Sequence, residues 1–250
     1  MRQWQSKAIH GGAMVAAMAG ICGGCAGDDS GGEPPIVNIT VSGNAFSFSL
    51  PGQPYGRIEG AEISVLEQPG AVTETEADGY FELALPPGSE ATFVMIAGGF
   101  PEAQTGTFTL PSEADLERVT FQIPDNSLLD SMAAMIQLTV DDTKCQLVST
   151  VTVAGKSIYD PGAHGEAGAT VSAEPALGPE HGPIYFNDAV IPTLGLTETS
   201  SDGGVLFTNV PPGTYLLAAH KDGVDIAPVT MKCRPNVLVN ASPPYGLQAQ

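Results

Sequence analysis

Residues 197–215 read Thr-Glu-Thr-Ser-Ser-Asp-Gly-Gly-Val-Leu-Phe-Thr-Asn-Val-Pro-Pro-Gly-Thr-Tyr, and they contain the strongest turn signals of the chain. Its Asp202-Gly203 pair is a strong signal for a tight hairpin turn, because glycine tolerates the positive φ that such turns need. The proline pair before Gly213 fixes φ and offers no N–H, so it ends the returning strand, and the glycine permits a reversal. The stretch therefore predicts short strands separated by tight turns.

The same landmarks occur earlier in the chain, in the same order. Each copy has a Gly-Ala strand start, a Thr-x-Thr-x-x-Asp-Gly turn and a Pro-Pro-Gly turn, followed ten residues later by a further turn glycine. Two copies of one unit indicate tandem domains and not a solenoid. The matched segments are residues 60–65 and 168–173, 73–79 and 197–203, and 86–88 and 211–213.

The strands of the unit show the alternation of a half-buried sheet. Ala61, Ile63 and Val65 alternate with polar residues, which is the period-2 pattern of a strand with one buried face. Short strands with closely spaced turn signals favour antiparallel sandwiches. We expect an all-β fold of two tandem antiparallel β-sandwiches, over residues 36–124 and 144–250.

A helical connector is expected between the two units, over residues 125–143. Polar Asp125 precedes a segment whose apolar residues have helical spacing, and Pro124 stands where a helix can begin. We therefore expect a short amphipathic helix packed on one or both sandwiches. The apolar residues are Leu128, Leu129, Met132, Met135 and Ile136.

Composition excludes several functional classes. The 250 residues carry a formal net charge of −19, and phosphate binding needs clustered Lys and Arg, so we expect no nucleic-acid partner. Only 15% of residues are charged and 42% are hydrophobic, which is typical of a packed domain and not of a disordered acidic chain.

The repeated landmarks resemble the carboxypeptidase regulatory-like domain. The second copy carries the fuller pattern, from Gly168-Ala169 through Phe207 to Tyr215, whereas the first copy has Ser89-Glu90 where the tyrosine is expected. The resemblance implies a transthyretin-like, immunoglobulin-type β-sandwich. Its residues are turn formers and core positions, so it implies a fold and no chemistry.

Residues 1–24 have the pattern of a signal peptide. Two basic residues precede a short apolar stretch ending near Cys22, and the stretch is too short for a transmembrane helix. Small residues before Cys25 and a polar tether over residues 25–35 resemble the lipobox region of bacterial lipoproteins. That resemblance implies lipidation at Cys25, with Cys22 as the weaker candidate; plain secretion and an uncleaved anchor are the alternatives.

The resemblance also implies a location. Ala26 follows the lipidated cysteine, which in a Gram-negative cell favours the outer membrane. We therefore expect a bacterial cell-envelope protein, attached to the membrane through an N-terminal lipid anchor and facing the periplasm or the surface.

Two cysteines remain after lipidation at Cys25. Cys145 opens the second unit and Cys233 lies near its last strand. An even number of remaining cysteines in an exported protein favours a disulfide between Cys145 and Cys233. The alternative is a pair of buried free thiols.

The sequence offers no recognisable catalytic set, metal site or cofactor motif, and we expect no enzymatic activity, no metal and no cofactor. Tyr215 and His220 resemble a segment of the iron-binding intradiol dioxygenases, but the downstream His-x-His is absent. Asp141, Asp142 and Asp202 could offer oxygens to calcium, yet no calcium loop is present, so they are interpreted as solvated turn acids.

The second copy has a longer loop, with 34 positions from Gly168 to Asp202 where the first has 18. Long loops on rigid scaffolds often bind ligands, and a covered edge or a packing loop is the alternative. The candidate binding residues are His181, Tyr185, Phe186 and Asn187.

We expect a non-enzymatic envelope lipoprotein whose sandwiches act as a structural or protein-interaction module for an envelope protein partner. The alternative is a carbohydrate- or peptide-binding surface module of an uptake or degradation system. Tyr185 and Phe186 are the candidates for stacking against a glycan, since the one tryptophan, Trp4, lies in the signal.

Overall fold

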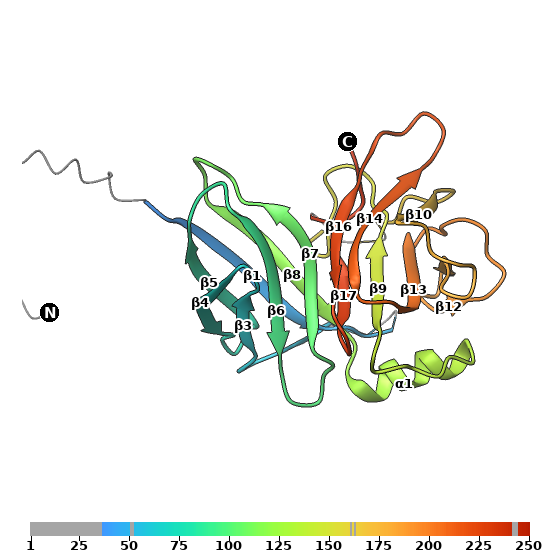
Figure 1. Ribbon diagram of the computed structural model, residues 1–250, viewed down its shortest axis with the longest axis horizontal. Helices are drawn as coiled ribbons and strands as arrows, with labels where there is room; N and C mark the ends of the chain where they lie inside the picture. The colour runs from blue at the N-terminus through green and yellow to red at the C-terminus, as the bar shows by residue number, and fades with distance from the viewer. Residues whose placement is uncertain (1–36, 51–52, 161, 163, 242–244) are drawn as a thin grey trace, which may run out of the picture. The chain divides into compact units, whose positions relative to one another are not determined.

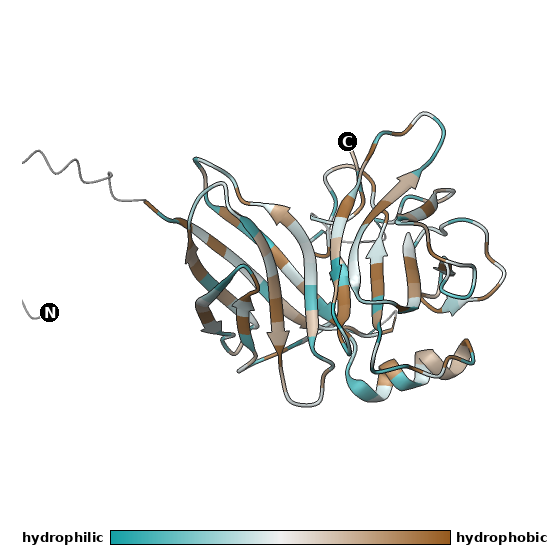
Figure 2. Cartoon of the chain, in the orientation of Figure 1, coloured by the Kyte–Doolittle hydropathy of each residue, from teal (hydrophilic) through white to brown (hydrophobic). Residues whose placement is uncertain are grey.

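The computed structural model describes residues 37–250 except 51–52, 161, 163 and 242–244. The expected signal peptide, tether and lipidation site at Cys25 lie outside the described residues. The fold is mostly β, with one helix among the described elements (Figure 1). Apolar and polar residues alternate along many of its strands (Figure 2), as expected for sheets with one buried face.

The first half of the chain forms a β-sandwich. In one sheet, β1 is central: it pairs antiparallel with β2 and β5 and parallel with β8. In the other sheet, the strand order is β4-β3-β6-β7, with antiparallel pairing throughout. The strands are β1 (Ile39–Ser47), β2 (Gly56–Arg57), β3 (Glu62–Val65), β4 (Gln68–Glu74), β5 (Tyr80–Leu85), β6 (Glu90–Ile96), β7 (Ala103–Thr109) and β8 (Leu116–Ile123).

The second half builds a second set of strands around its own core. One run has the order β10-β14-β16 and the other β17-β9-β13-β11-β12, while β15 pairs with β18. The strands are β9 (Cys145–Thr150), β10 (Thr170–Glu174), β11 (Ile184–Phe186), β12 (Pro192–Thr193), β13 (Gly204–Val210), β14 (Gly213–His220), β15 (Ile226–Ala227), β16 (Val229–Cys233), β17 (Leu238–Ala241) and β18 (Gln248–Ala249).

The two halves share one sheet. Strand β7 of the first half pairs antiparallel with β16 at Thr107–Thr230, and parallel with β17 at Ala103–Leu238. The buried hydrophobic residues form two clusters, one mainly from each half, with Leu238 of β17 in the cluster of the first half; residues 36–250 are a single compact unit. Strand pairing thus crosses the expected boundary between the two domains. The division into separate domains stays a prediction.

The Asp-Gly turn reverses the chain as predicted, but its flanking strands do not form a hairpin ladder. Gly79 has a φ of +77°, and its N–H donates to the Glu76 carbonyl at 2.8 Å. Strand β4 before the turn pairs with β3, whereas β5 after it pairs with β1 in the other sheet. The turn therefore carries the chain from one sheet to the other, and the expected hairpin is corrected.

Helix α1 (Asn126–Met135) lies within the expected connector. Asp125 caps its N-terminus, because the Asp125 carboxylate accepts a hydrogen bond from the Leu128 N–H at 2.8 Å. Met132 and Ala133 are buried, but Met135, which was expected on the apolar face, is 54% exposed. The packed face consists of positions 129, 132, 133 and 136, a stripe that leaves Met135 outside.

Candidate ligand-binding cavity

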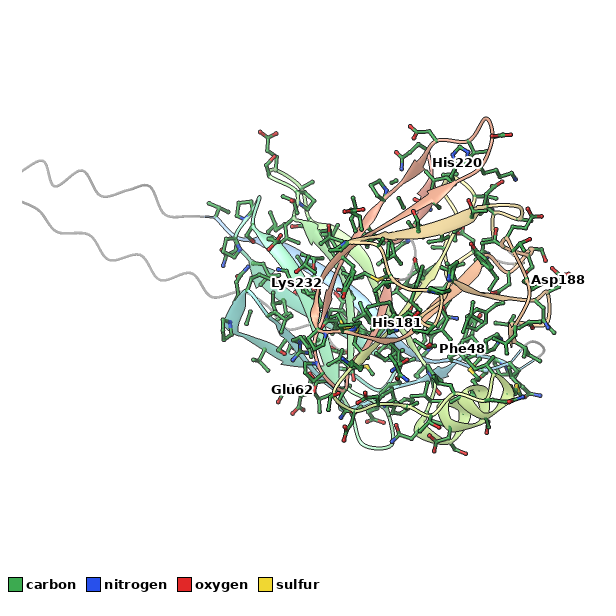
Figure 3. All side chains as sticks on the ribbon, turned by 45° about the vertical axis from the view of Figure 1, so that its right-hand side comes forward. Phe48, Glu62, His181, Asp188, His220 and Lys232 are labelled. Carbon is green, nitrogen blue, oxygen red and sulfur yellow. A yellow bond between two sulfur atoms is a disulfide. The ribbon has the colours of Figure 1, made fainter. Side chains whose placement is uncertain are left out.

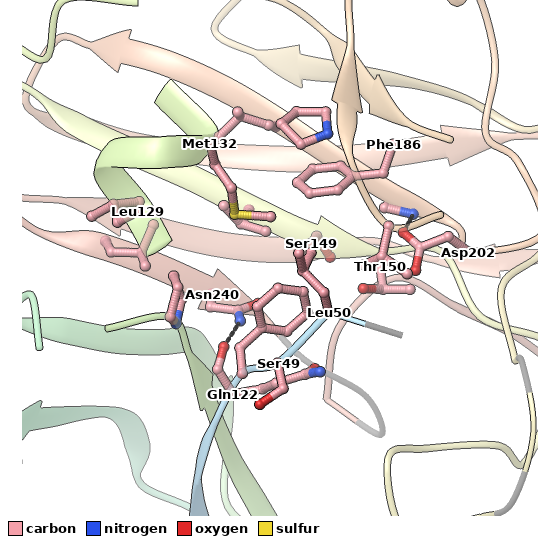
Figure 4. Close-up of a pocket in the computed structure, with 18 of the residues that line it drawn as sticks. Ser49, Leu50, Gln122, Leu129, Met132, Ser149, Thr150, Phe186, Asp202 and Asn240 are labelled. Atoms are coloured by element: carbon pink, nitrogen blue, oxygen red, sulfur yellow. Dashed lines mark hydrogen bonds between the residues drawn. The ribbon is translucent and has the colours of Figure 1, made fainter. Parts of the chain in front are cut away.

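A cavity of about 570 Å³ lies where α1, β9, β13 and the loop after β1 meet (Figure 4). This volume lies within the range of small-molecule sites, about 300–1,000 Å³. The helix contributes one apolar wall with Leu129, Met132 and Ala133, and aromatic rings come from Phe48 and Phe186. The cavity is thus assembled from segments far apart in the sequence.

Asp202 places a carboxyl group in this cavity. The turn that the sequence predicts holds it, and its Oδ2 accepts a hydrogen bond from the Gly204 N–H at 3.1 Å (Figure 4). Burial raises the pKa of Asp202 to about 6; the Gly204 hydrogen bond opposes the rise, and the nearby Asp188 carboxylate adds to it. Asp202 is therefore a titrating group in an apolar setting and not a solvated turn acid, which corrects the expectation.

Asp188 also lines the cavity, but it is exposed and differs from Asp202 in its hydrogen bonding (Figure 3). Its Oδ1 accepts from the Ser201 hydroxyl at 2.7 Å and from the Ser201 N–H at 3.1 Å. These hydrogen bonds favour the ionised form and lower the pKa of Asp188. The pair thus combines a fixed carboxylate with one whose charge changes near neutral pH.

His164 brings a third titratable group to the lining. Its Nδ1 is buried and has no hydrogen-bond partner among the described residues. Burial lowers the pKa of His164, because charging the ring would cost solvation, and the nearby Asp160 carboxylate opposes this. Burial therefore favours the neutral form of the imidazole.

Tyr55 and Gln122 border the cavity from the first half of the chain. Burial raises the pKa of the Tyr55 phenol, the charge of Asp202 raises it further, and a hydrogen bond with Gln122 opposes the rise. The Asn240 side-chain amide donates to the Gln122 backbone carbonyl at 2.6 Å and so joins β17 to β8 at this wall (Figure 4).

The first copy of the repeat has the same turn in a different environment. The Asp78 carboxylate accepts from the Tyr80 N–H at 2.9 Å, as the Asp202 carboxylate does from the Gly204 N–H. Asp78 is exposed, whereas Asp202 lines the cavity. The duplicated turn therefore carries a solvated acid in one copy and a cavity acid in the other.

The expected binding loop is partly strand and core. The Tyr185 side chain is 2% exposed, and its hydroxyl accepts from the Val171 N–H at 2.9 Å. Tyr185 therefore cannot present its ring to a glycan, and that expectation is corrected: β11 turns the residue into the hydrophobic core. Phe186 is also buried from the outer surface, but it lines the cavity.

The other two loop candidates hold local structure. The Asn187 side-chain carbonyl accepts from the N–H groups of Ala189 and Ile191, which shapes the bend after β11. The His181 Nδ1 lies 3.0 Å from the Thr208 carbonyl (His181 is labelled in Figure 3). Neither residue is part of the cavity lining.

The disulfide between Cys145 and Cys233 is confirmed. Both residues are buried, and the bond joins β9 to the end of β16 across a sequence separation of 88 residues. It ties the first strand of the second half to one of its last strands, as the cysteine count predicts.

The two residues that resemble the dioxygenase segment, Tyr215 and His220, have different surroundings and do not form a common site. The buried Tyr215 donates its hydroxyl to the Pro211 carbonyl at 2.9 Å, whereas His220 is exposed beside Asp222 on the hairpin between β14 and β16 (Figure 3). Within the described residues, no group of three or more His, Cys, Asp or Glu side chains could hold a metal ion. The described part of the chain also has no helix with the length and hydropathy to cross a membrane.

No protein-family model matches the chain, and no curated protein matches it. Among solved structures, the chain is similar to the Bacillus anthracis TIE protein (13% identity, TM-score 0.28, 82% of this chain and 34% of that one). It is also similar to the minor pilin GBS52 of Streptococcus agalactiae (11% identity, TM-score 0.27, 85% and 96%) and the shaft pilin spaA of Lactobacillus rhamnosus GG (12% identity, TM-score 0.27, 85% and 97%). The chain thus spans about a third of the TIE chain. At these identities and TM-scores the likenesses show neither a family nor a function for this chain.

The sequence did not predict the cavity. It marks Asp202 as a turn residue and as a possible calcium ligand, and its Asp-Gly turn signal is the same as that of Asp78. His164 and the packed face of α1 were also missed as site residues. The one sequence signal for the site is the apolar stripe of the helix, because an apolar helix face has to pack against another part of the protein.

Proposed function

We propose that this protein is a non-enzymatic, lipid-anchored binding protein of a bacterial envelope, and that its cavity holds a small, largely apolar ligand. One observation carries the proposal: a cavity of about 570 Å³ whose lining is more apolar than polar, with glutamine, asparagine, serine, threonine, histidine and aspartate side chains set among the apolar ones. Such a site can remove most of a small ligand's apolar surface from water, and the polar groups fix its orientation.

The envelope location is supported by the sequence and by the disulfide. Disulfides persist in oxidising compartments, including the periplasm and the cell surface. A lipid on Cys25 would anchor the chain to a membrane, which for Ala26 at the next position would be the outer membrane. The partner that delivers or receives the ligand would then be another envelope protein.

A second candidate function is that of a rigid structural or interaction module. The observation that favours it is the shared sheet, in which β7 pairs with both β16 and β17. Lys232 strengthens this junction, because its ammonium binds Glu67 and also binds Glu90, at 2.8 Å, both from the first half. A spacer of this kind would present its loops to a partner protein.

The carbohydrate alternative loses its main aromatic candidate, because Tyr185 is in the core. Sugars bind to aromatic faces with dense polar neighbours, whereas the walls of this cavity are mainly aliphatic and aromatic. An extended apolar ligand suits this lining better than a glycan does.

The binding proposal is tested with the neutral fluorescent probe 1-N-phenylnaphthylamine and two variants of α1. Ala133→Phe places a ring on the buried helix face that lines the cavity, whereas Ala134→Phe places it on the exposed face. We expect the wild type and Ala134→Phe to bind the probe and Ala133→Phe to lose at least tenfold in affinity. Thermal melting of both variants checks that they fold.

Two results would count against the binding proposal. One is a wild type that does not bind the probe at all. The other is equal binding by Ala133→Phe and Ala134→Phe, which would place the probe outside the cavity.

Lipidation is tested separately by metabolic labelling with radioactive palmitate. We expect label on the wild type and on Cys22→Ser, and none on Cys25→Ser. Label retained by Cys25→Ser but lost from Cys22→Ser would move the anchor to the other cysteine, and an unlabelled wild type would remove the anchor from the proposal.

A further inference from the structure

The proposed function leaves the chemical class of the ligand open. We propose, resting on that function, that the cavity selects an apolar molecule bearing one amine, whose ammonium group lies against the Asp202 carboxylate. The argument comes from the charges, walls and hydrogen bonds of the cavity.

The charges of the lining have one sign. Asp188 and Asp202 are its acids, and none of the described lining residues is Lys or Arg. No ion pair joins Asp202 to a cation in the described part of the chain, and the charge that acts on it is the like charge of Asp188. A partly buried carboxylate without a counter-ion carries a desolvation cost, and a bound cation would offset that cost.

The two basic residues in the described part of the first half, Arg57 and Arg118, are engaged elsewhere. The Arg57 guanidinium lies 4.3 Å from the centre of the Phe46 ring, and the Arg118 guanidinium 5.4 Å from that of Tyr159. Neither arginine lines the cavity. No Lys or Arg of the described lining neutralises Asp202, so a cationic ligand would supply the missing positive charge.

The walls fit the rest of such a molecule. Met132 and Leu129 of α1 face the cavity across from Phe186, with Asp202 and Thr150 at one side (Figure 4). The helix and Leu50 can bury an alkyl or aryl body, while the rings of Phe48 and Phe186 can also attract a cation through their faces. The arrangement is an apolar slot with one acidic end.

Ligands of other charge complement the acidic lining of the cavity less well. A carboxylate or a phosphate would be repelled by both aspartates and by a chain of net charge −19. A neutral alcohol of the same length would fill the walls but leave the Asp202 carboxylate without a counter-ion. Charge complementarity therefore favours the amine among molecules of equal size.

The proposal implies a pH dependence with a defined direction. An ammonium ion binds the ionised carboxylate, so protonation of Asp202 on lowering the pH weakens amine binding. Of the other titratable groups in the lining, a protonated His164 would add repulsion, although burial lowers its pKa and so opposes that protonation; Asp188 stays ionised, and Tyr55 stays neutral. Amine affinity should therefore fall between pH 7.5 and pH 5, whereas alcohol affinity should change little.

The test is isothermal titration of the full chain with octylammonium, 1-octanol and octanoate at pH 7.5 and at pH 5. We expect octylammonium to bind the wild type at least tenfold tighter than 1-octanol, and octanoate to bind more weakly than either. The Asp202→Asn variant should lose at least tenfold for octylammonium and keep its affinity for 1-octanol. Asp78→Asn is the matched control, since it alters the equivalent turn outside the cavity, and it should bind as the wild type does.

The outcomes separate the two proposals. Equal or tighter binding of 1-octanol or octanoate, or unchanged amine binding by Asp202→Asn, would overturn the amine inference. Failure of octylammonium to bind while 1-N-phenylnaphthylamine still binds would overturn this inference and leave the proposed function standing. If neither binds, the proposed function fails as well. Should Asp202→Asn not fold, the ligand preference and pH profile of the wild type decide.

Discussion

Thr75 and Thr199 make the same two side-chain hydrogen bonds in the two copies of the repeat. Each hydroxyl accepts from the N–H of the equivalent alanine, Ala61 or Ala169, at 2.9 Å in both copies. Each hydroxyl also donates to the backbone carbonyl three residues before that alanine, at 2.7 Å for Thr75 and 2.6 Å for Thr199. The second threonine of each Thr-x-Thr motif thus has the same structural role: it connects the segment before the turn to the start of a strand by hydrogen bonds.

Replacing either threonine by valine should therefore cost the protein stability. Valine keeps the shape but removes the hydroxyl, leaving a buried N–H and a carbonyl without their partner, at about 1–3 kcal/mol in each variant. Chemical denaturation of Thr75→Val and Thr199→Val measures the free energy of unfolding. Thr197→Val, at an exposed position of the same segment, should change it by less than about 0.5 kcal/mol. A loss in one copy alone would argue against the shared role.

Asp202→Asn should stabilise the protein in a pH-dependent way. The Asp202 pKa is raised from 3.8 to about 6 on folding, so this carboxyl favours the folded state fully below pH 3.8, and that contribution is lost as pH rises through 6. Asparagine does not titrate, and its advantage over aspartate should therefore grow by about 2–3 kcal/mol between pH 4 and pH 8. Denaturant unfolding at several pH values measures this difference.

Asp78→Asn provides the comparison for that series. Its carboxylate lies exposed in the equivalent turn outside the cavity, so this variant shows what the change from carboxylate to amide does without the cavity. A flat pH profile for Asp202→Asn would mean that Asp202 is solvated, contrary to its place in the cavity.

Removal of the disulfide should destabilise the folded chain. Reopening a loop with a separation of 88 residues returns entropy to the unfolded chain, which corresponds to about 4–5 kcal/mol in the chain-entropy model. The double variant Cys145→Ala/Cys233→Ala should show this loss in equilibrium unfolding without reductant. The wild type treated with reductant should approach the double variant, and no difference between oxidised and reduced wild type would contradict the expectation.

Gly203→Ala should be more harmful than the same change at Gly168. Both glycines have a positive φ, about +80°, so alanine is strained at either site. At Gly203, however, the added Cβ would lie 2.2 Å from the Val151 carbonyl oxygen, whereas at Gly168 it meets open space. We expect a lower melting temperature for both variants, with the larger decrease for Gly203→Ala; equal decreases would mean that the close approach adds nothing.

The features that the sequence predicted depend on local chemistry. The turn at Gly79 follows from the tolerance of glycine for positive φ, the helix cap at Asp125 from a carboxylate before an apolar stripe, and the Cys145–Cys233 bond from an even number of cysteines. Each of these signals is contained in a few residues and needs no knowledge of the rest of the fold.

The features that the sequence missed depend on residues that only the fold brings together. Asp78 and Asp202 have the same local sequence signal, and their difference arises because α1, Phe48 and Phe186 enclose only the second one. The pairing of β7 with β17 likewise joins segments more than a hundred residues apart, and neither strand carries a pattern that specifies the other. The expectation that Tyr185 is an exposed loop residue is wrong because the short strand β11 follows a glycine- and proline-rich stretch, which gives no strand pattern.

The most direct test of the account is a crystal structure of the protein grown with 8-bromooctylamine, in which anomalous scattering locates the bromine. We predict a bromine peak among Leu129, Met132 and Phe186, with the amine nitrogen within hydrogen-bonding distance of the Asp202 carboxylate. A bromine bound only on the outer surface, or an empty cavity at a saturating concentration of the compound, would contradict the claim that this cavity is the binding site.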